Sequence, residues 1–164
     1  MKIALITDTH FGARNDNLNF NEHFYQFYEG VFFPYLQQNN IKTCIHLGDC
    51  FDRRKYVSYR TAKDFRERFI IPFNTLGIDL HMLVGNHDIY YKNNNIHLYE
   101  DATEVDFDGL PILLMPWITQ SNELYAEGMI DETKAQICMG HLEINGFQMN
   151  KNVIVSQGGK DKEF

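Results

Sequence analysis

A chain of 164 residues with 44% hydrophobic and 14% aromatic side chains can bury a core and is too apolar to be a disordered segment. Its formal charge of −7 excludes binding of a polyanion through a broad basic surface. The same charge is compatible with carboxylates gathered around divalent cations. No apolar run approaches the ~18–20 residues that span a bilayer, and the three cysteines lack CxxC or CxxxC spacing, which argues against a disulfide framework or a zinc knuckle. We therefore expect one domain over residues 1–164 with a cytoplasmic location.

The first half of the chain alternates between predicted strands and predicted helices. Three short apolar runs each end in polar residues, as buried strands do: 2–8, 43–49 and 80–86. The segments between them carry aromatic and aliphatic residues close to helical spacing, and the second has Ser58 as a possible N-cap and Gly77 as a possible stop. Repeated strand–helix–strand units predict an α/β fold with a parallel sheet covered by helices.

The pattern changes in the second half. The stretch 91–100 is rich in asparagine and is predicted to be a loop. Residues 103–117 indicate two antiparallel strands around the turn Asp108-Gly109. A helix around 119–133, a strand over 135–143 and one more strand-like run within 147–164 complete the prediction.

Polar side chains with metal-binding potential follow four of the predicted strands. In an open parallel sheet, functional groups collect beyond the carboxyl ends of the strands. Carboxylate, imidazole and amide oxygen suit manganese, magnesium, iron or zinc. A single polar residue at such a position is usually a cap or a turn, and the other histidines, at 23, 46, 81 and 97, are assigned structural roles. The candidates at the four strand ends are Asp8, His10, Asp49, Asn86, His87 and His141.

The spacing of these candidates supports one common site. Asp8, Asp49 and Asn86 are separated by about one strand–helix–strand unit each. Neighbouring strands lie ~4.8 Å apart, so ligands at adjacent strand ends can converge on ions ~3.5–4 Å apart. Glycines at 48, 85 and 140 immediately precede ligands, where they allow sharp turns and leave room beside a metal.

Taken together and in this order, the motifs "DTH", "GDCFDR", "GNHD" and "GH" resemble those of the calcineurin-like metallophosphoesterases. Asp88 stands where the protein phosphatases of this superfamily carry glutamate. The stretches "LLMPWI" and "GHLEINGFQMN" are similar to the nuclease subunit of bacterial SbcCD and to the related phage recombination endonuclease subunit. The resemblance implies a sandwich of two sheets flanked by helices, in α-β-β-α layers.

The resemblance also implies a role for each matched residue. Two divalent ions, manganese by preference, activate a water that attacks phosphorus. Asp52 would orient His87, which faces the scissile phosphate and protonates the leaving oxygen. Asp88 would brace the turn, and Arg53 or Arg54 would contact substrate phosphate unless they are solvated loop residues. The implied metal ligands are Asp8 and His10 for the first ion, Asn86 and His141 for the second, and Asp49 as the bridge.

The sequence departs from the family pattern after His141. No Gly-His-x-His motif follows, and the nearest candidate ligand is Glu143. From the family pattern we also expect residues 1–164 to lack the capping region that helps to position DNA in the family and the C-terminal part of the sandwich. Three explanations are open: a fragment of a longer nuclease, one half of a split enzyme, or a degenerate protein with a weakened site.

The function implied by the resemblance is a two-metal phosphodiesterase that hydrolyses DNA, as the nuclease subunit of a recombination or repair complex. Its expected partners are DNA, an SbcC-like ABC-type coiled-coil ATPase and a second copy of the nuclease, in a host cytoplasm if the chain is phage-encoded. Two alternatives are a superfamily enzyme acting on other phosphoesters, such as phosphoproteins or cyclic nucleotides, and a non-catalytic docking or regulatory subunit.

Overall fold

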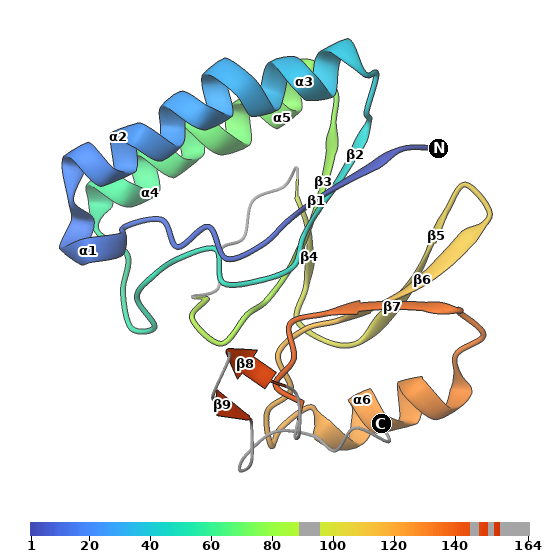
Figure 1. Cartoon of the computed structure of the whole chain (residues 1–164). Helices are drawn as coiled ribbons and strands as arrows, with labels where there is room; N and C mark the ends of the chain where they lie inside the picture. The colour runs from blue at the N-terminus through green and yellow to red at the C-terminus, as the bar shows by residue number, and fades with distance from the viewer. Residues whose placement is uncertain (89–95, 145–147, 151–152, 155–164) are drawn as a thin grey trace.

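The three apolar runs of the first half form neighbouring parallel strands, as predicted. The structure is a computed structural model that describes residues 1–88, 96–144, 148–150 and 153–154. Strands β1 (Ile3–Ile6), β2 (Thr43–His46), β3 (Asp79–Leu83) and β4 (His97–Tyr99) pair in that order, all in parallel (Figure 1). The strands end two or three residues before the predicted polar ends, so the candidate ligands lie on loops.

One predicted loop contains a strand. Residues 91–95 of the stretch 91–100 lie outside the described part. The rest of the stretch contains β4, which pairs with β3 so that His97 lies opposite His81. The ring centroids of His81 and His97 lie 4.5 Å apart, and the hydroxyl of Tyr99 lies 2.8 Å from Nδ1 of His81. Cross-strand ring contacts stabilise such a short strand, and a run of asparagines conceals it in the sequence.

Two long helices cover one face of this sheet. The first consists of α2 (Leu18–Phe27), η1 (Tyr28–Phe32) and α3 (Phe33–Gln38), preceded by the short α1 (Ala13–Asp16); the second consists of α4 (Tyr59–Phe65), η2 (Arg66–Ile70) and α5 (Ile71–Leu76). In each, a widened turn precedes a proline, at 34 and at 72, which cannot donate to the turn before it. The hydroxyl of Ser58 caps α4, and Gly77 ends α5 in the left-handed conformation, both as predicted.

The second sheet consists of β5 (Thr103–Phe107), β6 (Leu110–Met115) and β7 (Ile137–Gly140). Strands β5 and β6 are antiparallel around Asp108-Gly109, where both residues have positive φ, as the predicted hairpin turn requires. Helix α6 (Glu123–Glu132) connects β6 to the parallel β7. The last predicted run gives a small hairpin of β8 (Gln148–Asn150) and β9 (Val153–Ile154).

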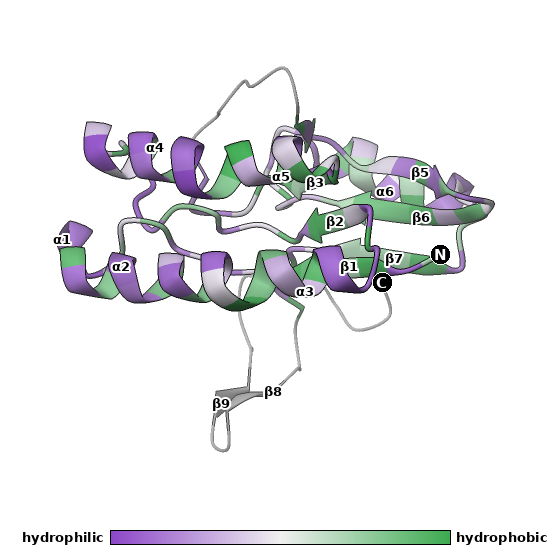
Figure 2. Ribbon diagram, turned by 90° about the horizontal axis from the view of Figure 1, so that it is seen from above, coloured by the Kyte–Doolittle hydropathy of each residue, from purple (hydrophilic) through white to green (hydrophobic). Residues whose placement is uncertain are grey.

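Three hydrophobic clusters define the layers. One cluster, including Phe69 and Phe73, lies between the long helices and the first sheet; a second, with Ile45 and Ile112, lies between the two sheets; a third joins the second sheet to α6. Strands β2, β6 and β7 are mostly hydrophobic, whereas the long helices alternate in hydropathy (Figure 2). The α-β-β-α layering is therefore confirmed. In the described part of the chain, every helix is too short or too polar to cross a membrane.

Candidate metal centre

The loops that follow β1 and β2 run side by side and carry the first candidate ligands. The amides of Asp8 and His10 donate to the carbonyls of Gly48 and Asp49, both at 3.1 Å, so the pairing of the strands continues into the loops. Asp8, His10 and Asp49 have φ of 52°, 43° and 53°. Non-glycine residues seldom adopt this left-handed conformation, and it often occurs where a functional side chain has to be aimed.

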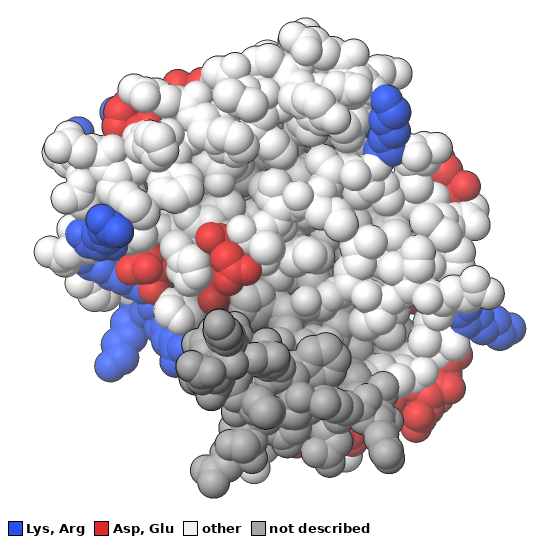
Figure 3. All heavy atoms as spheres, viewed as in Figure 1, with Lys and Arg blue, Asp and Glu red and all other residues white. Residues whose placement is uncertain are grey.

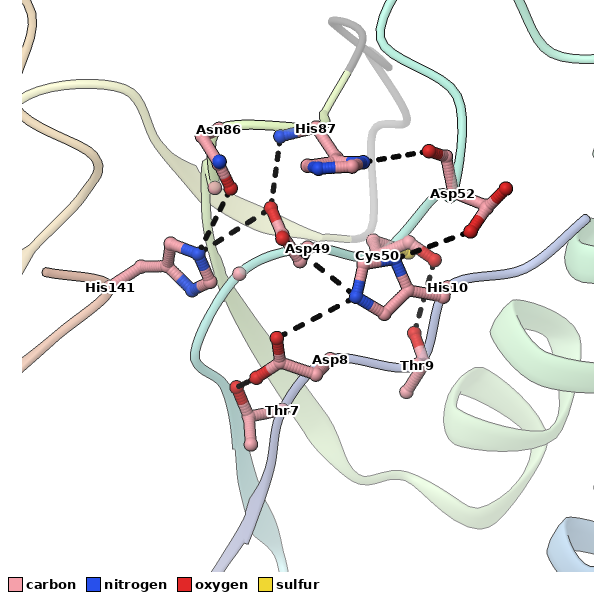
Figure 4. Close-up of polar contacts among 12 residues, drawn as sticks. Thr7, Asp8, Thr9, His10, Asp49, Cys50, Asp52, Asn86, His87 and His141 are labelled. Atoms are coloured by element: carbon pink, nitrogen blue, oxygen red, sulfur yellow. Dashed lines mark hydrogen bonds and ion pairs between the residues drawn. The ribbon is translucent and has the colours of Figure 1, made fainter. Parts of the chain in front are cut away.

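Asp49 lies at the centre of the site. It is 5% exposed, and its carboxylate accepts from the amide of His87 at 2.9 Å. Ligand atoms within 4.8 Å of one another form two groups, Asp8–Asp49–His141 and His10–Asp49–His87. Because Asp49 belongs to both groups, its position is the one that a bridging ligand needs (Figure 4).

His141 presents a lone pair to this centre. Its Nδ1 lies 3.0 Å from the carbonyl oxygen of Leu47, which can only accept, so Nδ1 carries the proton. In the neutral ring the lone pair is then on Nε2, which lies 3.5 Å from Oδ1 of Asp49. A histidine held through one ring nitrogen by a carbonyl, with the other nitrogen free, has the tautomer of a metal ligand.

The side-chain amide of Asn86 also presents an acceptor atom to this centre. Its Oδ1 faces only acceptor atoms, including Nε2 of His141 at 3.3 Å. Turned by 180°, its nitrogen would instead donate to Asp49 at 2.8–2.9 Å, and its oxygen would accept from Arg54 at 3.1 Å. The turned amide satisfies its neighbours by hydrogen bonds, whereas the orientation with oxygen inward suits a bound cation.

His10 contributes its Nε2 from the opposite side. This atom lies 3.6 Å from Oδ1 of Asp8 and 3.8 Å from Oδ2 of Asp49. Its Nδ1 is buried without a hydrogen-bond partner among the described residues, and the nearby carboxylate of Asp52 is 3.8 Å away. A small approach of Asp52 would place the proton on Nδ1 and leave the Nε2 lone pair for a metal.

Asp52 was expected to orient His87, and it contacts this histidine through its main chain. Nδ1 of His87 lies 2.7 Å from the main-chain carbonyl of Asp52, while the Asp52 carboxylate points toward His10 (Figure 4). Asp52 lies beside His10 and His87, and the turn of the loop determines which of these its carbonyl and its carboxylate contact.

His87 is engaged through both ring nitrogens. Its Nδ1 donates to the carbonyl of Asp52, and its Nε2 lies 3.2 Å from Nη2 of Arg54. A guanidinium only donates, so Nε2 is the acceptor. Although His87 belongs to one of the groups around Asp49, an arginine at its free nitrogen disfavours a cation there.

The two candidate arginines have different surroundings. Arg53 is held by Asp16 at 3.1 Å, by the amide oxygen of Asn15 and by the ring of Tyr56, whose centroid lies 4.8 Å from the guanidinium carbon. Arg54 is exposed and contacts His87 at the site. Arg53 thus ties the loop to α1, whereas Arg54 can reach a ligand.

Asp88 braces the turn that carries Asn86 and His87, as expected. Its carboxylate accepts from the amides of Cys50 at 2.7 Å, Phe51 at 3.1 Å and Gly85 at 2.7 Å. Burial is the main cause that raises its pKa above the usual range. Asp88 thereby joins the loop after β3 to the loop after β2.

Two residues that follow strands of the second sheet, Trp117 after β6 and Glu143 after β7, differ in their relation to the site. The amide of Trp117 donates to the carbonyl of Val84 at 2.8 Å, which joins the two sheets next to the site; its ring centroid lies 5.9 Å from that of His141. Trp117 was not selected from the sequence, where it only follows a strand. Glu143 is exposed and belongs to neither group of ligand atoms among the described residues, because β7 ends at Gly140 and strand alternation stops there.

Comparison with known proteins identifies the family. The calcineurin-like phosphoesterase model matches residues 1–161. The chain belongs to this family. It is 32% identical over 174 residues to exonuclease subunit 1 of Enterobacteria phage T4, covering 93% of the chain and 49% of that protein, so it spans about half the length of this curated relative. A crystal structure of a protein of unknown function from Aquifex aeolicus matches with 17% identity and a TM-score of 0.43, covering 98% of this chain and 90% of that one.

Family membership agrees with the donors that the fold brings together. Calcineurin-like phosphoesterases use divalent metals, and the side chains around Asp49 are carboxylates, imidazoles and an amide, which are ligands for such ions. The fold and the phosphoesterase family are thus established.

Proposed function

We propose that this chain is a two-metal-dependent phosphodiesterase that hydrolyses DNA, as the nuclease subunit of a recombination or repair complex. The observation that supports it most is the position of Asp49, which is shared by two groups of converging atoms. These groups combine Asp8 with His141 and His10 with His87, whereas the division of ligands proposed below follows the family motifs. The similarity to a phage exonuclease subunit favours a nucleic acid as substrate over other phosphoesters.

The proposed ligands are Asp8 and His10 for one ion and Asn86 and His141 for the other, with Asp49 between them. Manganese is the preferred ion, with magnesium, iron and zinc as alternatives, since all donors are oxygen or imidazole nitrogen. When bound, two such ions would make a water more acidic and would neutralise charge on the phosphate. The hydrogen bond from His141 to the Leu47 carbonyl keeps its lone pair aimed at this position.

His87 and Arg54 are proposed to act on the substrate. An arriving phosphate oxygen competes with Nε2 of His87 for the Arg54 guanidinium, because a charged acceptor forms the stronger hydrogen bond. Released from Arg54, Nε2 can take up a proton from solvent and give it to the leaving oxygen, while Nδ1 keeps its proton and stays bonded to the Asp52 carbonyl. In this proposal the Asp52 carboxylate supports His10.

The charge distribution fits a DNA ligand that is held locally. Lys and Arg side chains gather beside α1, next to Asp and Glu side chains near the middle of the same face (Figure 3). Because the net charge of the chain is −7, the rest of its surface adds little attraction for DNA phosphates. We therefore propose that an ABC-type coiled-coil ATPase partner and a second nuclease copy contribute to DNA binding.

Hydrolysis assays with Mn²⁺ test this proposal. The chain is expected to hydrolyse bis-p-nitrophenyl phosphate and linear DNA faster than p-nitrophenyl phosphate, and His87→Ala is expected to lower the DNA rate by about 100-fold or more, the usual contribution of a general acid. Preference for the monoester would indicate a phosphatase. Absence of metal-dependent turnover, together with no effect of His87→Ala, would contradict the proposal.

The two arginines provide a matched pair of variants. Arg54→Ala is expected to raise the KM for DNA by about tenfold with an unchanged melting temperature, because one charge-assisted contact is worth about 1.4 kcal/mol or more. Arg53→Ala is expected to lower the free energy of unfolding by about 1–2 kcal/mol, since it removes several bonds to Asn15, Asp16 and Tyr56. Steady-state kinetics and thermal unfolding of both variants measure these effects; an exchange of the two results would reverse the assignment.

A further inference from the structure

A fully buried histidine lies at the end of β2, behind the candidate metal centre. His46 is 0% exposed, and burial is the main cause that lowers its pKa to about 3, so the ring is neutral. The amide of Gly48 donates to Nδ1 at 3.2 Å, which leaves the proton on Nε2. Nε2 lies 2.9 Å from Oγ1 of Thr9, which therefore accepts from it.

Thr9 passes this contact on to the neighbouring loop. Its hydroxyl donates to the carbonyl of Cys50 at 3.1 Å (Figure 4). Both ring nitrogens of His46 and the Thr9 hydroxyl are thus satisfied in one chain of bonds. Thr9 is 9% exposed. Buried polar groups cost free energy unless they are hydrogen-bonded. Here these three groups all have partners.

The chain of bonds joins the loops at the residues that carry the ligands. Thr9 stands between Asp8 and His10, both with positive φ, and Cys50 directly follows Asp49, which also has positive φ. Main-chain hydrogen bonds align the two loops. Among the described residues, the Thr9 hydroxyl adds a bond from a side chain of the first loop to the main chain of the second.

We propose that the Thr9–His46 pair is a positioning element that holds the Asp8–His10 loop at the correct distance from Asp49 for metal binding. This inference rests on the proposed metal centre. Thr9 and His46 touch neither ion nor substrate in this role; they act through Asp8, His10 and Asp49. An apolar side chain at position 46 could fill the same space beside Phe69, whose ring centroid lies 6.4 Å from that of His46, but it would not fix the loops.

The test compares Thr9→Val, which keeps the shape and removes the hydroxyl, with Thr9→Ser, which keeps the hydroxyl. Phe73→Leu, on the buried face of α5, is the control for general destabilisation. Mn²⁺ affinity is measured at a temperature where all variants are folded. Thr9→Val is expected to bind Mn²⁺ about tenfold or more weakly, the usual effect of losing a group that orients ligands, whereas Thr9→Ser and Phe73→Leu stay within about twofold of the wild type.

Amide hydrogen exchange in metal-free protein separates this inference from the proposed function. Thr9→Val is expected to speed exchange at His10 and Phe11, whose amides donate to the second loop, relative to Phe73→Leu. Unchanged exchange and unchanged Mn²⁺ affinity in Thr9→Val would overturn the positioning role. A wild-type chain that takes up no Mn²⁺ would contradict the proposed function, and the exchange result would still decide whether the pair holds the loops.

Discussion

An Asp49→Asn variant is expected to lose the metal pair. The substitution removes the charge shared by the two ligand groups and replaces one carboxylate oxygen with a donor that repels a cation. Mn²⁺ affinity should fall by at least about 100-fold, above the range seen when only supporting groups are removed. Because the ions supply several kcal/mol of transition-state stabilisation, diester hydrolysis should fall by about 1,000-fold or more.

The matched control is Asp108→Asn in the β5–β6 turn. Asp108 is exposed and has φ of 55°, close to the 53° of Asp49, so both variants place asparagine in the same left-handed conformation. Isothermal titration with Mn²⁺ and rates with bis-p-nitrophenyl phosphate measure both variants. Equal behaviour of Asp49→Asn and Asp108→Asn would show that Asp49 is not a ligand.

Gly85→Ala is expected to disrupt the same centre through steric overlap. A Cβ at this position would lie 2.2 Å from the amide nitrogen and 2.4 Å from Oδ1 of Asp49. Nothing flexible can give way, because one neighbour is main chain and the other is the short, buried side chain of Asp49. The loops after β2 and β3 would have to separate, at a cost of about 3 kcal/mol, and Mn²⁺ binding should be lost.

Gly128→Ala in α6 serves as the control, since a Cβ there meets nothing within 4 Å. Alanine in a helix interior is favoured over glycine, so this variant should gain about 0.5–1 kcal/mol of stability. Urea unfolding and Mn²⁺ titration distinguish the two. A Gly85→Ala protein with wild-type stability and metal affinity would be incompatible with the packing described for Asp49.

Much of the site could be predicted because strand ends in a parallel sheet are brought together by the topology itself. Asp8, Asp49 and Asn86 each follow one of three adjacent strands, and pairing of β1, β2 and β3 leaves few other places for them. The glycine at 85 was predicted to leave room beside a metal; the structure shows that its missing side chain makes room for Asp49.

What the sequence did not indicate depends on the path of individual loops. The motif does not predict that Asp52 contacts His87 through its carbonyl and points its carboxylate at His10. The carbonyl and the carboxylate belong to one residue, and the turn of the loop decides which of them faces each histidine. Nor could adjacent arginines be told apart until Asn15 and Asp16 of α1 were placed beside Arg53. The histidine at 46 was correctly expected to be structural, but its bond to Thr9 links residues 37 positions apart.

Electron paramagnetic resonance during a Mn²⁺ titration tests the central claim most directly. If Asp49 bridges two ions held by Asp8, His10, Asn86 and His141, the chain will take up two Mn²⁺ and give the spectrum of an exchange-coupled pair. A single uncoupled Mn²⁺ per chain at saturation, or no bound Mn²⁺, would contradict the two-metal centre.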